Sequence, residues 1–288
     1  MKIGAIIQAR MASCRLPGKI LLPLPHGGSA TVLDQVILRV SKSKRVDEIV
    51  VATTDNPSDE PLVRFCEGRG IQVFRGSESN VLSRFVFCAQ KFGMDHIVRL
   101  TGDNPCVDWQ LIDELVETHL NEKNDYSSIV LSSSFPHGIS AEVITHTALA
   151  DANERATQPY EIEHVTPFIY KTCPGDFRIG VIQADPARTG PHIRVTLDTP
   201  EDYLLLRAVF DLLGDPLTFL TADIVRLFTE KPWLLEINGR VQQKTVCRNL
   251  EEELAEALRL LKAQDLNLAA EYLRDHVRQE YCAQEPME

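Results

Sequence analysis

Several features that mark familiar nucleotide-handling and membrane proteins are missing from this sequence. Its 288 residues contain no Gly-x4-Gly-Lys-Ser/Thr loop, and the first expected turn lacks the Gly-x-Gly-x-x-Gly pattern of dinucleotide-binding folds. No apolar run reaches the length that is needed to cross a membrane. These absences argue against a P-loop nucleotidase, a dinucleotide-dependent oxidoreductase and an integral membrane protein.

Positive charge and paired cysteines are also scarce. The sequence has 30 lysines and arginines against 41 aspartates and glutamates, and the net charge of −11 disfavours binding to nucleic acid or to an anionic membrane. The seven cysteines are scattered without a Cys-x-x-Cys pair, which favours reduced thiols over a disulfide framework. The apolar run after Lys2 is too short for a signal peptide. We therefore expect a cytoplasmic protein with no nucleic-acid or membrane partner.

The cations that are present gather in one short stretch near the N-terminus. An isoleucine-rich run, residues 3–7, is typical of a buried strand, and the loop that follows it carries Arg10, Arg15 and Lys19. In open α/β sheets ligands bind at the ends of strands, and arginine forks together with a mobile ammonium group suit a triphosphate. The alternative is a solvated basic surface loop, which this stretch alone would favour.

Strands and helices alternate after this loop. Such alternation is typical of a doubly wound, mostly parallel α/β sheet. The expected strands are residues 48–53, 72–74 and 97–100, and the expected helices are residues 32–40, 81–92 and 111–120. We assign residues 1–217 to this α/β domain and residues 218–288 to a mainly helical extension. Within the extension, amphipathic helices are expected at residues 250–261 and 266–281.

Two aspartates are expected at strand ends, where a metal ion bound to phosphates would be held. Asp103 follows strand 97–100 within a Thr-Gly-Asp-Asn-Pro stretch, and Asp198 follows a strand that is expected to end at Leu197. Mg²⁺ prefers hard oxygen ligands and typically takes one or two carboxylates together with substrate phosphates. The alternative for Asp103 is an Asx turn that caps the next helix. We assign helix-capping roles to three other residues, Asp108, Thr199 and Glu201.

The N-terminal loop also resembles a known motif. Its pattern Ala-Arg-x-x-Ser-x-Arg-Leu-Pro-Gly-Lys, residues 9–19, is similar to the nucleotide-binding motif of the sugar cytidylyltransferases, which include the acylneuraminate and 3-deoxy-manno-octulosonate activating enzymes. Because Gln8 precedes this pattern, the likeness is greater to the branch of spore-coat polysaccharide biosynthesis protein F. The resemblance implies a nucleotide-diphospho-sugar transferase (Rossmann-like) fold and a CTP site that extends to the turn after the third strand. The implied nucleotide-binding residues are Ala9, Arg10, Ser13, Arg15, Lys19, Arg75, Gly76 and Ser77.

The middle of the chain, residues 126–183, departs from the simple alternation and carries a second resemblance. In the same branch, a Pro-x-Gly-x-Asp-x-Glu stretch and an Arg-Glu-His-Val-Thr stretch lie on the sugar side of the site. Here Ser140 stands in place of the usual aspartate and Ile162 in place of the usual arginine, which leaves room for a different acceptor. The alternative for His164 is that it only helps to begin a helix running to Tyr170. The implied acceptor-binding residues are His137, Glu142, Glu163 and His164.

These elements together predict a cytidylyltransferase that transfers CMP from CTP to a sugar or sugar acid, releasing pyrophosphate, in the biosynthesis of surface polysaccharides or glycoconjugates. Arg10, Arg15 and Lys19 would neutralise the triphosphate, and Asp103 and Asp198 would hold Mg²⁺. A nucleotide-sugar-dependent glycosyltransferase is one alternative, although no Asp-x-Asp pair lies at the expected strand end. A non-catalytic nucleotide-binding relative is another, although both carboxylates are retained. The apolar stripe of the last helix, and the dimers common among related enzymes, lead us to expect a homodimer.

Overall fold

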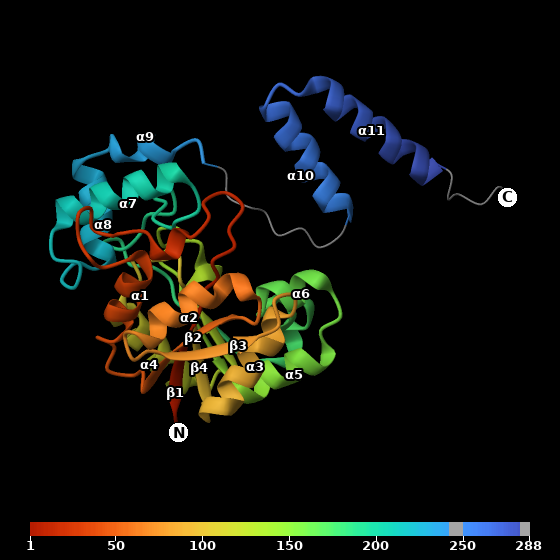
Figure 1. Ribbon diagram of the computed structural model, residues 1–288. Coiled ribbons are helices and arrows are strands. Elements are labelled where there is room, and N and C mark those ends of the chain that lie inside the picture. The colour runs from red at the N-terminus through yellow and green to blue at the C-terminus, as the bar shows by residue number, and fades with distance from the viewer. Residues whose placement is uncertain (242–249, 283–288) are drawn as a thin grey trace. The chain divides into compact units, whose positions relative to one another are not determined.

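The chain folds into two compact units. The computed structural model describes residues 1–241 and 250–282 and divides the chain into the units Met1–Val241 and Gln242–Glu288 (Figure 1). The first unit contains the whole sheet, and the second contains two helices.

A mixed sheet forms the centre of the first unit, with the strand order β3-β2-β1-β4-β6-β5-β7. β1 pairs in parallel with β2 and β4, and the pairs β2–β3 and β5–β7 are also parallel. β6 runs antiparallel to its neighbours β4 and β5. The mostly parallel sheet predicted from the sequence is therefore confirmed. The strands are β1 (Ile3–Gln8), β2 (Glu48–Thr54), β3 (Gln72–Gly76), β4 (His96–Thr101), β5 (Tyr126–Ser128), β6 (Glu142–Thr145) and β7 (Ile179–Val181).

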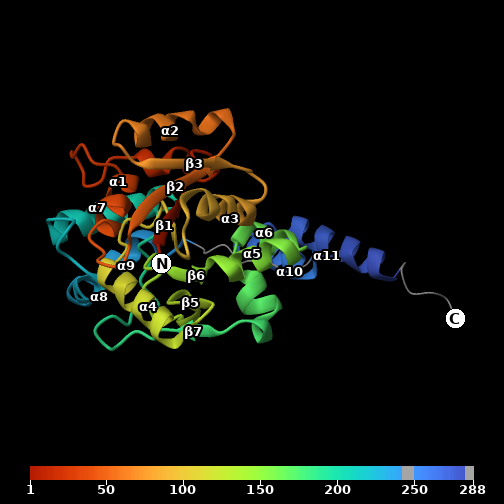
Figure 2. The same cartoon turned by 90° about the horizontal axis from the view of Figure 1, so that it is seen from below.

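Helices cover both faces of the sheet, as the second view shows (Figure 2). Successive residues of a strand point to opposite faces, so Ile6 and Ile7 of β1 belong to different core clusters. Ile7 packs in the cluster of α1, α2, α4 and α7, and Ile6 packs in that of α3 and α5, so the sheet is doubly wound as predicted. The helices that cover the sheet are α1 (Val32–Val40), α2 (Glu60–Glu67), α3 (Val81–Phe92), α4 (Trp109–Glu122), α5 (His146–Arg155), α6 (Pro159–His164) and α7 (Pro200–Leu213).

The strand order places a topological switch between β1 and β4. The chain moves from β1 outward through β2 to β3 and then returns to add β4 on the other side of β1. The loops that leave these two neighbouring parallel strands separate there, and this is where open α/β sheets bind their ligands. The loop at residues 9–19 leaves β1, and the stretch that contains Asp103 leaves β4. The fold therefore brings the predicted phosphate loop and the first predicted metal ligand to one edge of the sheet.

Two local predictions are wrong. Residues before Leu197 do not form a strand of the sheet, because their backbone bonds to a neighbouring turn instead: Val195 N–H donates to His137 O at 2.7 Å, and Leu197 N–H donates to Asp103 O at 2.9 Å. The helix expected to run from Glu161 to Tyr170 ends at His164, because Val165 adopts a positive φ of 74°. A separate turn of π-helix covers Phe168–Thr172.

The first unit extends further than the expected boundary after residue 217. α8 (Thr221–Glu230) and α9 (Leu234–Asn238) belong to it, because Ile224, Leu227 and Leu234 are buried in the same apolar cluster as α7. The structure therefore divides the chain after Val241. Apolar side chains that pack against an existing core do not form an independent unit, even when their helices follow a segment that is interrupted by a proline such as Pro216.

The second unit contains the hairpin of α10 (Leu250–Ala263) and α11 (Asn267–Cys282), close to the two helices predicted. Among the side chains described in these helices, only Ala270 is buried. Across the described part of both units, no helix combines the length and apolar character that a membrane span requires.

A fully buried arginine joins α1 to segments that are distant in the sequence. Arg39 Nε donates to Val107 O at 2.7 Å, its Nη2 donates to Phe219 O at 2.9 Å, and its Nη1 donates to Pro216 O. The guanidinium also lies over the Phe219 ring, 4.3 Å from its centroid. One cation thus provides the donors for three carbonyl groups that would otherwise be unpaired in the interior.

We predict that Arg39→Leu lowers the free energy of unfolding by about 3 kcal/mol or more, because each stranded carbonyl costs on the order of 1–3 kcal/mol. Urea unfolding followed by circular dichroism would measure this loss. Arg45→Leu is the matched control, since Arg45 pairs with Glu117 at the surface, where both side chains are about half exposed and a pair contributes only about 0–1 kcal/mol. Equal stability of the two variants would show that Arg39 does not have this role.

Candidate active site

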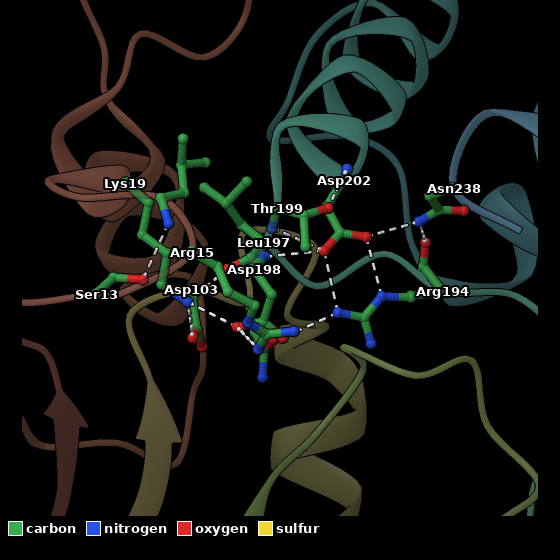
Figure 3. A network of polar contacts seen from close by, with 12 residues as sticks. Ser13, Arg15, Lys19, Asp103, Arg194, Leu197, Asp198, Thr199, Asp202 and Asn238 are labelled. Atoms are coloured by element: carbon green, nitrogen blue, oxygen red, sulfur yellow. Dashed lines mark hydrogen bonds and ion pairs between the residues drawn. The ribbon is translucent and has the colours of Figure 1, made fainter. Parts of the chain in front are cut away.

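Lys19 lies at the centre of the candidate site. It begins a short 3₁₀ turn (Lys19–Leu21) directly after Gly18, whose φ of 67° is readily adopted only by glycine. The lysine is 8% exposed, and its Nζ donates to Asp103 Oδ2 at 2.7 Å, to Asp198 Oδ1 at 2.9 Å and to Leu197 O at 2.6 Å (Figure 3). The structure therefore brings together three of the four predicted catalytic residues, Lys19, Asp103 and Asp198, whereas Arg10 is not part of this cluster of contacts.

Asp103 is held by the end of β4. At Gly102 a Cβ would lie 3.0 Å from the Ala9 Cβ, so glycine relieves a tight approach between the loops that leave β4 and β1. Thr101 Oγ1 then donates to Asp103 Oδ1 at 2.7 Å, while the other carboxylate oxygen faces Lys19. Both oxygens of Asp103 are therefore oriented by named donors. Its predicted alternative role as a helix cap is taken by Asp108, which accepts from Gln110 N–H at 2.9 Å.

Asp198 is surrounded by three cations. Besides Lys19, its Oδ1 lies 3.0 Å from Arg15 Nη2, and its Oδ2 lies 2.9 Å from Arg194 Nη2. Burial alone would raise the pKa of Asp198, but Lys19, Arg15 and Arg194 lower it to about 2. The carboxylate therefore stays ionised throughout the neutral range.

A buried carboxylate, that of Asp202, holds Arg194 in its position beside Asp198. Asp202 is fully buried and accepts from Arg194 Nε at 2.9 Å and from Asn238 Nδ2 at 2.8 Å (Figure 3). It also closes the capping box of α7, because Thr199 N–H donates to Asp202 at 3.1 Å and Asp202 N–H donates to the Thr199 hydroxyl. The predicted cap at Thr199 is confirmed, but its partner at the third helical position is Asp202 and not Glu201.

The remaining loop residues have mixed environments. Arg10 is exposed just beyond β1, whereas Ala9 is buried and its N–H donates to Ala52 O at 3.1 Å. Ser13 Oγ accepts from Leu16 N–H at 3.4 Å, a contact within the loop itself. Arg10 and Arg15 are thus the loop cations that solvent or a ligand can reach, and Ala9 and Ser13 shape the backbone between them.

Two arginines lie near the turn after β3, and only one of them, Arg75, was predicted to bind the nucleotide. Arg75 Nη1 bonds Glu60 at 3.0 Å and its Nη2 donates to Asn56 O at 3.1 Å, so this side chain is engaged by the segment that follows β2. Arg84 of α3, which no motif singled out, is 2% exposed and donates to Ser77 O at 3.0 Å. Its pKa is lowered by burial and by the positive charge of Arg10.

Glu142 is the most enclosed of the predicted acceptor-binding residues. Its carboxylate accepts from Tyr126 OH at 2.6 Å and from Thr166 Oγ1 at 2.8 Å, and it pairs with Arg99. The side chain is buried at 6% exposure, and burial beside this carboxylate raises the pKa of Tyr126. Glu142 therefore links β4, β5 and the turn after α6. Because its carboxylate is engaged by these protein groups, it supports the site instead of facing it.

The three other predicted acceptor-binding residues lie nearer the solvent. His137 is exposed, and its backbone pairs with that of Arg194 and Val195, which brings this turn against the segment that leads to Asp198. Its pKa is lowered by partial desolvation and by the Arg194 charge. Gly138 has a φ of 103° and a Cβ there would lie 2.5 Å from Thr196 N, which fixes this turn against the Asp198 segment. Glu163 is exposed, and His164 is partly buried at the end of α6.

Sequence reasoning missed the residues that support the cluster from a distance, Arg194, Asp202, Asn238 and Arg84. Arg194 and Asp202 flank Asp198 in the sequence, and the spacing of Thr199 and Asp202 is a capping-box pattern that would have drawn attention to Asp202. Asn238 lies beyond the expected end of the domain, and no local pattern distinguishes it or Arg84.

We predict that Lys19→Met raises the pKa of Asp198 from about 2 toward its ordinary value of 3.8, because its nearest cation is removed. A carboxyl group whose pKa is lowered in the folded state stabilises the protein above pH 4, and this contribution is lost as the pH falls toward 2. Between pH 4 and pH 2 the free energy of unfolding should therefore fall less in Lys19→Met than in the wild type. Carbon-13 NMR titration of the Asp198 carboxyl would measure the change. Lys42→Met, remote from the site, should leave the titration unchanged; an unshifted Asp198 in Lys19→Met would contradict the assigned contact.

Comparison with known proteins places this chain in a family. Residues 4–249 match a family model described as cytidylyltransferase. Spore coat polysaccharide biosynthesis protein SpsF of Bacillus subtilis is 38% identical over 232 residues, which cover 79% of this chain and 94% of that protein. The protein MJ1063 of Methanocaldococcus jannaschii is 39% identical over 255 residues, 88% of this chain and all of the relative. A solved cytidylyltransferase of Leptospira borgpetersenii matches with a TM-score of 0.76 and 30% identity over 86% of this chain and 99% of its own. The chain belongs to the cytidylyltransferase family.

Proposed function

We propose that this cytidylyltransferase transfers CMP from CTP to a hydroxyl group of a sugar or sugar acid, releases pyrophosphate, and serves the biosynthesis of a surface polysaccharide or glycoconjugate. The observation that carries the proposal is the joint placement of Lys19, Asp103 and Asp198 at the switch between β1 and β4. The name of the B. subtilis relative, a spore coat polysaccharide biosynthesis protein, supports the polysaccharide context.

We propose Mg²⁺ as the cofactor, held by Asp103 and Asp198. The fit rests on the donor set, because oxygens of both carboxylates lie within 2.9 Å of one nitrogen, Lys19 Nζ, so the space between them accepts a positive charge. Two carboxylates are the usual protein contribution to a Mg²⁺ site that also receives phosphate oxygens. The ion would supply charge neutralisation at the phosphates.

The side chains of this site would act mainly by binding and orientation. Transfer of a nucleotidyl group requires the attacking hydroxyl and the leaving pyrophosphate to be aligned while negative charge is neutralised. Arg10, Arg15 and Lys19 would provide that neutralisation from the loop after β1, since all three lie at its strand end. Arg84, buried beside Ser77 and near Arg10, would add a fixed positive charge on the α3 side.

We propose that the acceptor enters from the side of His137, Glu163 and His164. His137 lies beside the Asp198 cluster, which would bring an acceptor hydroxyl close to the phosphates. A neutral imidazole can orient or deprotonate a hydroxyl group near physiological pH, which is the role we propose for His164. Glu142 would contribute indirectly, by holding Thr166 and Tyr126 in place.

We also propose a cytoplasmic location. The described cysteines are free thiols, and three of them, Cys66, Cys88 and Cys106, are buried, with burial raising the pKa of each to about 12. Such unpaired, unreactive thiols suit a reducing compartment.

We predict that CTP with Mg²⁺ raises the melting temperature more than ATP, GTP or UTP, since a ligand that binds only the folded state adds about 2.7 kcal/mol at a hundredfold excess over its dissociation constant.

Asp103→Asn and Asp198→Asn should abolish pyrophosphate release in a screen of sugars and sugar acids. Asp211→Asn, an exposed change on α7, is the control and should retain activity. A larger shift with another nucleotide would reject CTP, and full activity in either site variant would reject that residue as a ligand.

We further propose that the chain is a homodimer, and we place its interface on α10 instead of on the last helix, α11, whose apolar stripe led us to expect a dimer. Leu254, Leu258 and Leu261 form a stripe on this helix that stays partly exposed in the hairpin. Glu251 and Lys262 lie on one flank of the stripe, because they are three turns apart. Antiparallel pairing with a second copy would therefore cover the stripe and set each acidic helix start against a basic helix end.

We predict that sedimentation analysis returns twice the chain mass of 32.3 kDa at micromolar concentration, and that Leu258→Asp returns the single mass. A buried charge in the stripe is costly when it is unpaired, whereas Ala255→Asp on the exposed surface of the same helix should preserve the dimer. A wild-type chain that sediments as a monomer would reject the proposal, and two dimeric variants would reject α10 as the interface.

A further inference from the structure

Asn104, the residue after Asp103, links two loops of the site. Its side chain is buried, with 7% exposure, and Nδ2 donates to Thr101 Oγ1 at 2.9 Å and to Ser140 Oγ at 2.7 Å. Thr101 ends β4, whereas Ser140 lies in the turn that precedes β6. The amide thus joins the strand end that carries Asp103 to the turn on the acceptor side.

The direction of each hydrogen bond in this chain follows from one charged group. A carboxylate can only accept, so the single hydroxyl proton of Thr101 points to Asp103 Oδ1, 2.7 Å away. Thr101 Oγ1 can then only accept from Asn104, which must present its NH₂ group. The second N–H of this group goes to Ser140 Oγ. The orientation of the Asn104 amide is therefore determined by its neighbours.

This orientation comes at a cost to the amide itself. Asn104 Oδ1 is buried and has no hydrogen-bond partner among the described residues. A buried carbonyl group without a partner destabilises a protein by about 1–3 kcal/mol. The hydrogen bond to Thr101, and through it to Asp103, therefore determines the orientation of the amide, although this orientation leaves Oδ1 without a partner among the described residues.

We propose that Asn104 is a positioning residue for Asp103 and acts through the Thr101 hydroxyl. By donating to Thr101 Oγ1, it holds in place the hydroxyl group whose proton goes to Oδ1, which leaves Oδ2 of the same carboxylate facing Lys19 and the space between Asp103 and Asp198. Ser140, at the far end, restrains the amide by accepting its second N–H. The inference rests on the proposed role of Asp103 as a metal ligand, because its consequence is the correct presentation of that oxygen.

The test measures Mn²⁺ affinity by electron paramagnetic resonance on the full chain with saturating CTP, alongside the free energy of unfolding in urea. Asn104→Leu has a similar volume but no donor, and Thr101→Val removes the hydroxyl while keeping the shape. Each should weaken Mn²⁺ binding about tenfold, the lower end of the range for groups that orient metal ligands. Thr101→Ser, which retains the hydroxyl, should bind Mn²⁺ as the wild type does.

The double variant Asn104→Leu/Thr101→Val distinguishes positioning from general support of the fold. Residues in one hydrogen-bond chain are coupled, so the double variant should bind Mn²⁺ no more weakly than Thr101→Val alone. Additive losses that follow the free energy of unfolding would show a merely structural role and overturn the inference. If Asn104→Leu does not fold, Ser140→Ala releases the amide without removing it, and unchanged Mn²⁺ affinity in that variant would overturn the inference equally.

Asp103→Asn separates this inference from the function on which it rests. If Asp103→Asn loses Mn²⁺ binding while Asn104→Leu stays within about twofold of the wild type, Asp103 keeps its proposed role and the positioning by Asn104 is rejected. If Asp103→Asn binds Mn²⁺ as tightly as the wild type, or the wild type binds none, the metal role of Asp103 fails and the inference fails with it. CTP binding measured by calorimetry without metal shows whether the nucleotide site itself is intact.

Discussion

The site depends on a lysine ammonium group held between two carboxylates from different parts of the chain. Lys19 comes from the loop after β1, Asp103 from the end of β4, and Asp198 from the segment before α7, and the Lys19 nitrogen contacts both of the other segments within 2.9 Å. An interior charge is tolerated only when opposite charges and hydrogen-bond partners surround it. This requirement brings the three segments to one place at the strand ends.

Further polar contacts hold the carboxylates of Asp198 and Asp103 in place. Arg194 extends the cluster from Asp198 to the fully buried Asp202, which is in turn fixed by Asn238 and by the first turn of α7. On the other side, the Thr101 hydroxyl and the Asn104 amide hold Asp103. A reaction that proceeds by alignment and charge neutralisation benefits from such support, because small displacements of the charged groups cost much of the rate.

The residues of the proposed acceptor side are held differently from those around Lys19. Glu142 is paired with Arg99, Tyr126 and Thr166 beneath the surface, so its carboxylate links strands and a turn. The histidines and Glu163 lie nearer to solvent, where an incoming sugar could meet them. The proposed nucleotide end is thus prearranged by buried charge, whereas His137, Glu163 and His164 of the proposed acceptor end lie nearer to the solvent.

The sequence by itself determined the alternation of strands and helices, the cationic loop that leaves the first strand and Asp103, because these follow from local apolar periodicity and from residue types at strand ends. Asp198 was also named from the sequence, although the strand expected before it does not form. Only the tertiary structure decided which residues support them. Asn238 and Arg84 have no local pattern, and Arg194 to Leu197 form no strand because their partners, His137 and Asp103, lie far away in the sequence. The same holds for Glu142, whose burial depends on three groups brought to it by other elements, since local sequence sets the conformation of a segment but not the neighbours that its side chains meet.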